Sequence, residues 1–193
     1  MKNIQTDRKV YTGIGSRDIT VTEESYISYL SDELCAKGWT VVSGNANGVD
    51  IAFQRHVPHI AVLPWPKFNY KAFTPDKVWV LSEDDTEALD SVKTYYPTPE
   101  RLSQGAYKLM ARNYRQVVGR TQNTKFVLYC SDHNSKGQIK GGTAQAVKLA
   151  KDKGILTVNI RYVIGIAYPK QLANLVVSDY KTPNNFLYQL KTL

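Results

Sequence analysis

The chain has 193 residues, of which 42% are hydrophobic and 22% are charged, as in an ordinary soluble globular protein. This length predicts a single domain over residues 1–193 with a sizeable core. Lysine and arginine outnumber aspartate and glutamate by 25 to 17, and the net charge of +8 favours polyanionic partners. No apolar run approaches the roughly 20 residues of a membrane span, so we expect no membrane partner.

The cysteines and histidines argue against a secreted or metal-binding protein. Cys35 and Cys130 lie far apart in apolar contexts, and we expect free, buried thiols in a reducing cytoplasm. The N-terminal residues 1–7 contain no apolar signal region. The three histidines are scattered without zinc-site spacing, so we expect no metal.

The first predicted element is a buried strand at residues 9–16 that breaks into a glycine turn and meets a helix. Gly13 and Gly15 carry no Cβ and let a ligand approach the backbone, and Ser16 and Arg17 add a hydroxyl and a guanidinium. Free backbone N–H groups and the dipole of the following helix favour a phosphate at such a turn. A plain strand-to-helix turn that binds nothing is the alternative.

This turn differs from the fingerprint of NAD- and FAD-binding proteins. Asp18 stands at the position of the third glycine of that fingerprint. The second strand, at residues 39–43, ends without the acidic residue that holds a ribose. We therefore expect no dinucleotide cofactor.

The first 63 residues alternate between strands and helices. A helix capped by Thr22 ends at Gly38, a second helix covers residues 48–55, and a third strand covers residues 60–63. This alternation predicts an α/β fold, a Rossmann-like, doubly wound, mostly parallel sheet with helices on both faces.

A second glycine turn, at residues 43–50, joins the second strand to the second helix. It should lie beside the first turn at the carboxyl edge of the sheet, where ligands bind in open α/β sheets. Asp50 in its first helical turn could cap the helix, or hold a ligand hydroxyl or a positive residue such as Arg17.

An excursion rich in proline and aromatic residues follows at about residues 64–98, with a short strand near Val78–Leu81. It is too aromatic to be a disordered linker, and we expect it to fold over one end of the sheet. It could be a packed structural segment or a lid whose rings stack on a base.

A long helix is predicted from Thr98 to Val118, because a capping threonine precedes a proline and an acid. At about 100° per residue, its basic residues gather on one face. These are Arg101, Lys108, Arg112 and Arg115. The face could track a phosphate backbone or simply be solvated. Asn113 falls inside the apolar stripe and is expected to cross-link loops at the sheet edge.

A third glycine turn precedes the next helix. A strand is predicted at residues 125–131, a helix from Gly141 to Lys153 and a strand at residues 155–160, with a short final helix near Pro183. Gly141, Gly142 and Thr143 form another backbone cradle for phosphate. The cradle is not a P-loop, because its lysine precedes the glycines.

In order along residues 9–160, these motifs resemble the DNA-processing protein A (DprA/Smf) family, within the wider group that it shares with the LOG phosphoribohydrolases. The resemblance rests on the stretches 15–17, 43–50, 112–119 and 141–143. The run Leu63-Pro64-Trp65 is similar to compact, single-domain members common in phage and mobile DNA. The resemblance implies an extended Rossmann-like fold that binds single-stranded DNA or a nucleotide, commonly as a dimer.

The sequence departs from both branches of that group. DprA proteins usually carry flanking domains for which this chain has no room, so a role in loading recombinase onto DNA is not expected. LOG enzymes carry glutamates after their glycine-threonine turn, whereas Gln145 and Ala146 stand here. Cleavage of an N-glycosidic bond by that mechanism is therefore not expected.

The sequence favours a cytoplasmic, metal-free protein that binds a nucleotide or single-stranded nucleic acid, as a homodimer or higher homo-oligomer. The predicted binding residues are Gly13, Gly15, Ser16, Arg17, Ser43, Gly44, Asn45, Gly48, Asp50, Arg112, Asn113, Arg115, Gly141, Gly142 and Thr143. One alternative is a nucleotide N-glycosidase that uses Asp50, Glu83 or Asp84 to stabilise an oxocarbenium-like state. Another is a protein that sequesters a nucleotide signal without cleaving it.

Overall fold

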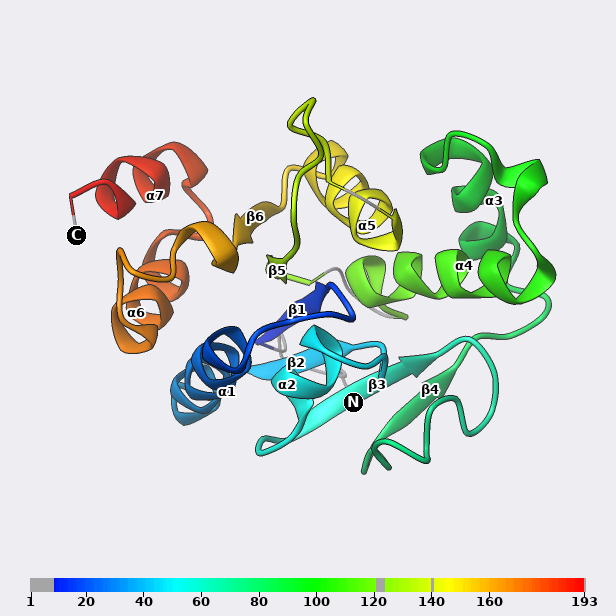
Figure 1. Ribbon diagram of the computed structural model, residues 1–193, viewed down its shortest axis with the longest axis horizontal. Helices are drawn as coiled ribbons and strands as arrows, with labels where there is room; N and C mark the ends of the chain where they lie inside the picture. Colours follow the sequence, from blue (N-terminus) through cyan, green and yellow to red (C-terminus); the bar gives the residue numbers. More distant parts are fainter. Residues whose placement is uncertain (1–8, 121–123, 140, 193) are drawn as a thin grey trace, which may run out of the picture.

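The computed structural model describes residues 9–120, 124–139 and 141–192, which form a parallel sheet between two layers of helices (Figure 1). The sheet has six strands in the order β4-β3-β2-β1-β5-β6, and every neighbouring pair is parallel. The strands are β1 (Val10–Gly15), β2 (Thr40–Ser43), β3 (His59–Leu63), β4 (Val78–Val80), β5 (Phe126–Cys130) and β6 (Leu156–Asn159).

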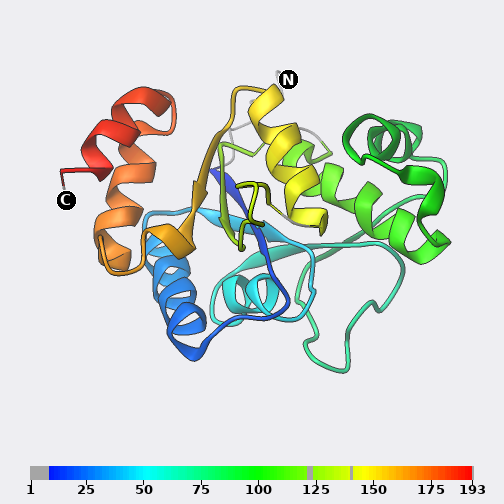
Figure 2. The ribbon, with the colours of Figure 1, turned by 45° about the horizontal axis from the view of Figure 1, so that its top comes forward.

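The helices divide between the two faces of the sheet, as Figure 2 shows. One face carries α1 (Val21–Ala36), α2 (Val49–Gln54), α6 (Pro169–Asp179) and α7 (Pro183–Leu190). The other face carries α3 (Thr86–Tyr95), α4 (Gln104–Val118) and α5 (Gly141–Asp152). Two 3-10 turns, η1 (Pro99–Arg101) and η2 (Ile160–Tyr162), complete these elements. The Rossmann-like, doubly wound α/β fold expected from the alternation of elements is confirmed.

Alternating side chains of the central strand bind the two layers to the sheet. Tyr11 packs in the core beneath α1 and α2, and its ring stacks on Phe126 with centroids 5.3 Å apart. Thr12 points the opposite way, and its hydroxyl donates to the Gln116 carbonyl of α4 at 2.6 Å. This period of two lets one strand serve both cores.

The strand order creates a crevice beside β1. The chain proceeds from β1 to β2, β3 and β4 on one side, and then crosses to place β5 on the other side of β1. Gly15 and Cys130 end their strands side by side. Such a switch point, at the carboxyl ends of parallel strands, is where open α/β sheets bind ligands.

The start of α1 differs from the prediction. The capping residue is Thr20 and not Thr22: its hydroxyl accepts from Glu23 N, and the Glu23 carboxylate accepts from Thr20 N at 2.8 Å. This reciprocal pair satisfies two N–H groups that Thr22, inside the first turn, cannot reach. Gly13 and Gly15 lie within β1, and residues 16–20 separate them from α1. The dipole of α1 therefore does not act on the glycine pair as expected.

The predicted helix over residues 98–118 is interrupted. Pro99–Arg101 forms only a 3-10 turn, Leu102 is extended, and α4 begins after Ser103, whose hydroxyl accepts from Ala106 N. The serine is the stronger cap because its side chain satisfies a helix N–H, whereas Thr98 makes no such bond. The short strand expected near Val78–Leu81 is present as β4, whereas α3 and α6 were not predicted.

Candidate functional site

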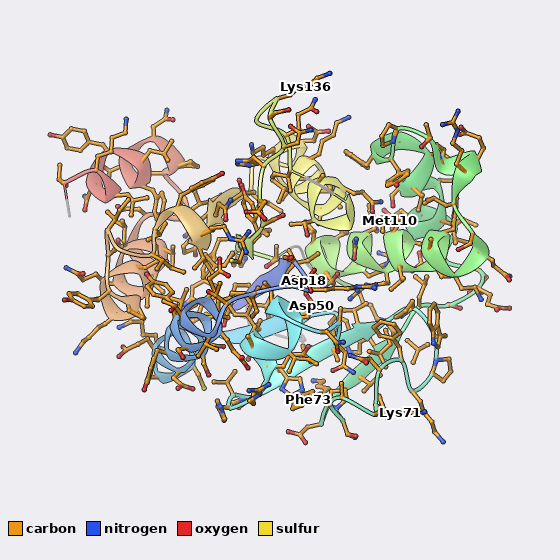
Figure 3. All side chains as sticks on the ribbon, in the orientation of Figure 1. Asp18, Asp50, Lys71, Phe73, Met110 and Lys136 are labelled. Carbon is orange, nitrogen blue, oxygen red and sulfur yellow. The ribbon has the colours of Figure 1, made fainter. Side chains whose placement is uncertain are left out.

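A pocket of about 330 Å³ lies at the switch point between β1 and β5. In Figure 3, Asp50 and Met110 mark its α2 and α4 sides. Its lining comes from the ends of β1 and β5, the turn after β2, the middle of α4 and the start of α5. The lining residues are Ile14, Gly15, Ser16, Arg17, Ala46, Asp50, Leu109, Met110, Arg112, Asn113, Ser131, Asp132, Gly141, Gly142 and Thr143. The three glycine-rich segments predicted to meet at one sheet edge do meet there.

A buried ion pair forms one wall of the pocket. Arg112 Nη1 donates to Asp50 Oδ2 at 3.4 Å, and the two side chains are only 6% and 2% exposed. Burial raises the pKa of the Asp50 carboxyl, and the charge of Arg112 opposes that rise. Ala46 N also donates to Asp50 at 3.3 Å, which fixes the carboxylate above the second glycine turn.

Arg112 has unused hydrogen-bonding capacity. A guanidinium carries five N–H donors, and among the described residues the contact with Asp50 is its one hydrogen bond. Its Nε is buried without a partner. Its Cζ lies 5.9 Å from the centre of the Phe68 ring, so a further side of the group is covered by an aromatic face. A buried arginine this poorly satisfied favours an anion that would complete its bonding.

Gly44 makes this ion pair sterically possible. A Cβ at that position would lie 1.0 Å from Arg112 Nη1 and 2.7 Å from Asp50 Oδ2. Any side chain at residue 44 would thus occupy the space of the guanidinium. The glycine leaves room for Arg112, which approaches from the distant helix α4, and it does not itself line the pocket.

Arg17 also lines the pocket, on the loop that follows β1. Its side chain is exposed and makes no hydrogen bond or ion pair with any residue in the described part of the chain. Burial lowers the pKa of Arg112, and the nearby charge of Arg17 lowers it further. The two arginines therefore repel one another across the pocket. Of the alternatives considered for Asp50, a pair with Arg17 is not found, because Asp50 pairs with Arg112.

Gly48 fixes the loop that carries Arg17. It has φ of 77°, and an added Cβ would lie 2.4 Å from the carbonyl oxygens of both Ser16 and Arg17. The amide of Val49 donates to Ser16 O at 3.1 Å, and Ser16 N donates to Cys130 O at 2.8 Å. Backbone contacts thus hold the loop between the second turn and β5, which positions the guanidinium without any side-chain partner.

The start of α5 closes the pocket. Asn113 Nδ2 donates to Gly142 O at 3.2 Å, so it cross-links α4 and α5 as expected. An added Cβ on Gly142 would lie 2.8 Å from that nitrogen and 2.9 Å from the methyl carbon of Met110. This close packing of α5 on α4 brings the positive end of the α5 dipole to the pocket, which the two arginines also line.

Two acidic residues line the pocket, and both are paired with arginines. Asp50 is held by Arg112, and Asp132 is held by Arg161, which also binds the Glu23 carboxylate. Arg17 and the α5 start are therefore the charges left uncompensated, and the pocket favours an anion.

Six of the predicted binding residues do not line the pocket: Gly13, Ser43, Gly44, Asn45, Gly48 and Arg115. A Cβ on Gly13 would lie 2.4 Å from the Phe53 ring, so this glycine allows α2 to pack on β1. The Ser43 hydroxyl donates to Gly13 O at 2.6 Å in the interior. Asn45 holds the excursion, since its Nδ2 donates to Phe68 O at 2.9 Å and to Phe73 O at 3.1 Å. Gly13, Ser43 and Asn45 thus shape the site from the protein interior.

The continuous basic face predicted for residues 101–115 is absent from the described structure. Arg112 turns inward to Asp50, and Lys108 pairs with Glu83 at 2.9 Å. Arg115 binds Asp85 at 2.6 Å and Glu87 at 2.9 Å. These two acids come from the N-cap and the first turn of the unpredicted α3, and they neutralise this part of α4.

The other acids considered for catalysis lie away from the pocket. Glu83 binds Lys108, and Asp84 accepts a hydrogen bond from Ser82 on the excursion. Gln145 and Ala146 are buried in α5 and do not line the pocket. Asp50 is the one earlier catalytic candidate that does, and it is committed to Arg112.

Six pocket residues were not predicted: Ile14, Ala46, Leu109, Met110, Ser131 and Asp132. Ser131 and Asp132 directly follow β5, and the rule that ligands bind at carboxyl ends of strands could have found them. Within the described residues, no group of three or more histidine, cysteine, aspartate or glutamate side chains could hold a metal. Cys130 is buried as expected, whereas Cys35 is only half-buried.

Comparison with known proteins agrees with this architecture. The family model described as DNA recombination-mediator protein A matches residues 3–73. The chain resembles DprA proteins. That match spans β1 to β3 and both early glycine turns, and confirms the resemblance there, while Arg112 and the Gly141–Thr143 turn lie beyond it. No curated protein matches the sequence significantly.

Two solved structures were found to be similar to the chain. DNA processing protein A from Helicobacter pylori, described for its single-stranded DNA binding mode, has 21% identity and a TM-score of 0.58, covering 89% of this chain and 80% of that chain. DprA from Streptococcus pneumoniae has 16% identity and a TM-score of 0.42, covering 76% of this chain and 47% of that chain. The first comparison establishes the shared fold. No helix among the described residues is long and apolar enough to cross a membrane.

Proposed function

We propose that this chain is a DprA-like protein that binds single-stranded DNA by holding a backbone phosphate in the switch-point pocket. The observation that carries the proposal is the pair of arginines that line this pocket close enough for their charges to interact. Arg112 is buried with unused donors, and Arg17 has no partner in the described structure. A phosphate between them would accept charge-assisted hydrogen bonds and relieve their mutual repulsion.

The start of α5 supports the same ligand. Backbone N–H groups of its first turn and the helix dipole act on an anion without adding a side chain. Gly141, Gly142 and Thr143 line the pocket opposite the second glycine turn. Asp50 and Asn113 order the site, the first by fixing Arg112 and the second by fixing α5.

Binding is favoured over cleavage of an N-glycosidic bond. Such cleavage needs a carboxylate free to stabilise the developing positive charge on the sugar. Asp50 is already paired with Arg112, Asp132 with Arg161, and the α5 start carries glutamine and alanine where LOG enzymes have acids. A protein that holds a nucleotide without cleaving it would use the same phosphate contacts. Comparing an oligonucleotide with a mononucleotide therefore distinguishes a DNA-binding from a nucleotide-binding function.

The experiment is fluorescence polarisation with a labelled oligothymidylate over a range of salt concentrations, with thymidine monophosphate as competitor. Each phosphate neutralised on a single strand contributes about −0.7 to the slope of log K against log salt. Because most cations of α4 are paired with acids, we expect a shallow slope from few phosphates. If thymidine monophosphate binds as tightly as the oligothymidylate, the result would instead support a nucleotide-binding protein. No binding of either at low salt would contradict the proposal.

The proposal also includes the oligomeric state of the protein and its location in the cell. We expect a single domain over residues 1–193 that acts as a homodimer or higher homo-oligomer in the cytoplasm. Large exposed apolar side chains support an oligomer: Val21, Ile166 and Tyr168 lie exposed near the point where Tyr26 of α1 bonds to Ala167 O. Light scattering of the purified chain tests this expectation, and a monomer at all concentrations would contradict it.

A further inference from the structure

The segment from residue 64 to residue 75, here called the aromatic loop, connects β3 to β4 beside the phosphate pocket. It contains Trp65, Phe68, Tyr70 and Phe73 with Lys67 and Lys71, and Asp76 and Lys77 complete the connection to β4. Figure 3 shows Lys71 projecting outward from this loop. Aromatic side chains interleaved with lysines are typical of surfaces that bind single-stranded nucleic acid.

The aromatic loop is fixed to the second glycine turn. Asn45 Nδ2 donates to Phe68 O and Phe73 O, and Asn69 Nδ2 donates to Asn45 O at 2.9 Å and to Asn47 Oδ1 at 2.8 Å. Asn45 has φ of 59°, in the left-handed region that asparagine adopts more readily than most residues. The loop is therefore held in place before any ligand binds, which lowers the entropic cost of using its rings.

Two rings connect the pocket to the surface. Phe68 covers the Arg112 guanidinium, and Trp65 meets Phe68 edge to face with ring centroids 5.2 Å apart. Trp65 is 36% exposed, whereas Phe68 is half-buried. The sequence of contacts runs from the buried arginine through Phe68 to an indole at the surface.

The contact of Trp65 with helix α4 is independent evidence that the indole lies near the pocket. An added Cβ on Gly105 would lie 3.9 Å from the Trp65 ring, so Trp65 sits against the first turn of α4. Gly105, Leu109 and Arg112 share one helical face, and the last two line the pocket. Seven residues of helix rise by about 10 Å, so the indole lies within reach of a nucleotide next to the bound phosphate.

We propose that Trp65 is a stacking platform for a base of the strand whose phosphate occupies the pocket. This inference rests on the proposed function and extends it by assigning a base-binding residue. Stacking accepts any base, because every base has an aromatic face, so the platform adds affinity without sequence preference. It also favours an oligonucleotide over a mononucleotide, whose single base and phosphate are too close together to reach both sites.

The test compares Trp65→Ala and Trp65→Phe with the wild type, and uses Trp79→Phe as a matched control. Trp79 lies on β4, where it packs against Arg120 away from the pocket. We expect Trp65→Ala to weaken oligothymidylate binding about 5- to 100-fold, the range of base–aromatic stacking. Trp65→Phe should retain most of the affinity, and Trp79→Phe should change nothing. The salt slope should not change, because stacking neutralises no phosphate.

Two further readouts keep the outcome unambiguous. Oligothymidylate should quench tryptophan fluorescence in the Trp79→Phe protein, in which Trp39 is buried and Trp65 is exposed. A fully abasic strand should bind the wild type and Trp65→Ala with equal affinity. Unchanged oligothymidylate affinity in a folded Trp65→Ala protein would overturn the platform while leaving the phosphate pocket intact. Failure of the wild type to bind any strand would overturn both proposals.

Discussion

Replacing Arg17 with alanine separates a phosphate ligand from a structural role at the pocket. In the described structure the guanidinium has no hydrogen bond or ion pair to lose, so the free energy of unfolding should change by no more than about 0.5 kcal/mol. A charge-assisted hydrogen bond to phosphate contributes about 1.5–3 kcal/mol. We therefore expect Kd for oligothymidylate to rise about 10- to 100-fold at constant salt.

The salt dependence of binding gives a second, independent measure of the effect of Arg17→Ala. Loss of one phosphate contact should make the slope of log K against log salt shallower by about 0.7. Arg17→Lys should restore the slope but only part of the affinity, because lysine keeps the charge and loses the planar fork of donors. Fluorescence polarisation across a salt series measures both quantities.

Arg55→Ala is the matched control for the change in net charge. Arg55 is also an exposed arginine, but it pairs with Glu24 at 2.6 Å at the far end of α2. Arg55→Ala should leave the oligothymidylate affinity and the slope of log K against log salt within error of the wild type. A folded Arg17→Ala protein with unchanged Kd and unchanged slope would refute the assignment of Arg17 to the phosphate site.

Three further predictions test the surroundings of the pocket. Gly44→Ala should disrupt the Asp50–Arg112 pair and lower both thermal stability and DNA affinity, because its Cβ would overlap Arg112 Nη1; unaltered melting and binding would disprove the steric argument. Arg115→Met should cost about 2 kcal/mol at pH 7 by urea unfolding without weakening DNA binding. Its hydrogen bonds hold the pKa of Asp85 below the usual value, so the deficit should shrink as pH falls below about 4, and a pH-independent deficit would contradict this. Chromatography should detect no free base released from nucleoside monophosphates; release by the wild type that is lost in Asp50→Asn would favour a glycosidase.

The sequence alone predicted the fold and the meeting of three glycine turns, because both follow from local signals. Alternating buried strands and amphipathic helices define the parallel sheet, and its connections bring the turns to one edge. Arg17 could be assigned to that edge for the same reason. The same rule applies to the residues that follow β5, but Ser131 and Asp132 belong to no motif that drew attention to them.

The pairing of charges could not be predicted, because it depends on contacts between distant segments. Arg112 and Arg115 are three residues apart on α4, yet one reaches Asp50 and the other reaches Asp85. Their separation depends on Gly44, which leaves room for one guanidinium, and on α3, which the aromatic composition of the excursion concealed. The sequence pattern placed both arginines on one basic face of the helix, whereas tertiary packing buries Arg112.

A crystal structure of the chain with a short oligothymidylate tests the central claim most directly. The account predicts a backbone phosphate in the switch-point pocket, within hydrogen-bonding distance of the Arg17 and Arg112 guanidinium groups and of the first N–H groups of α5. Arg112 should keep its contact with Asp50. A strand bound elsewhere on the surface, with Arg17 and Arg112 untouched, would contradict the account.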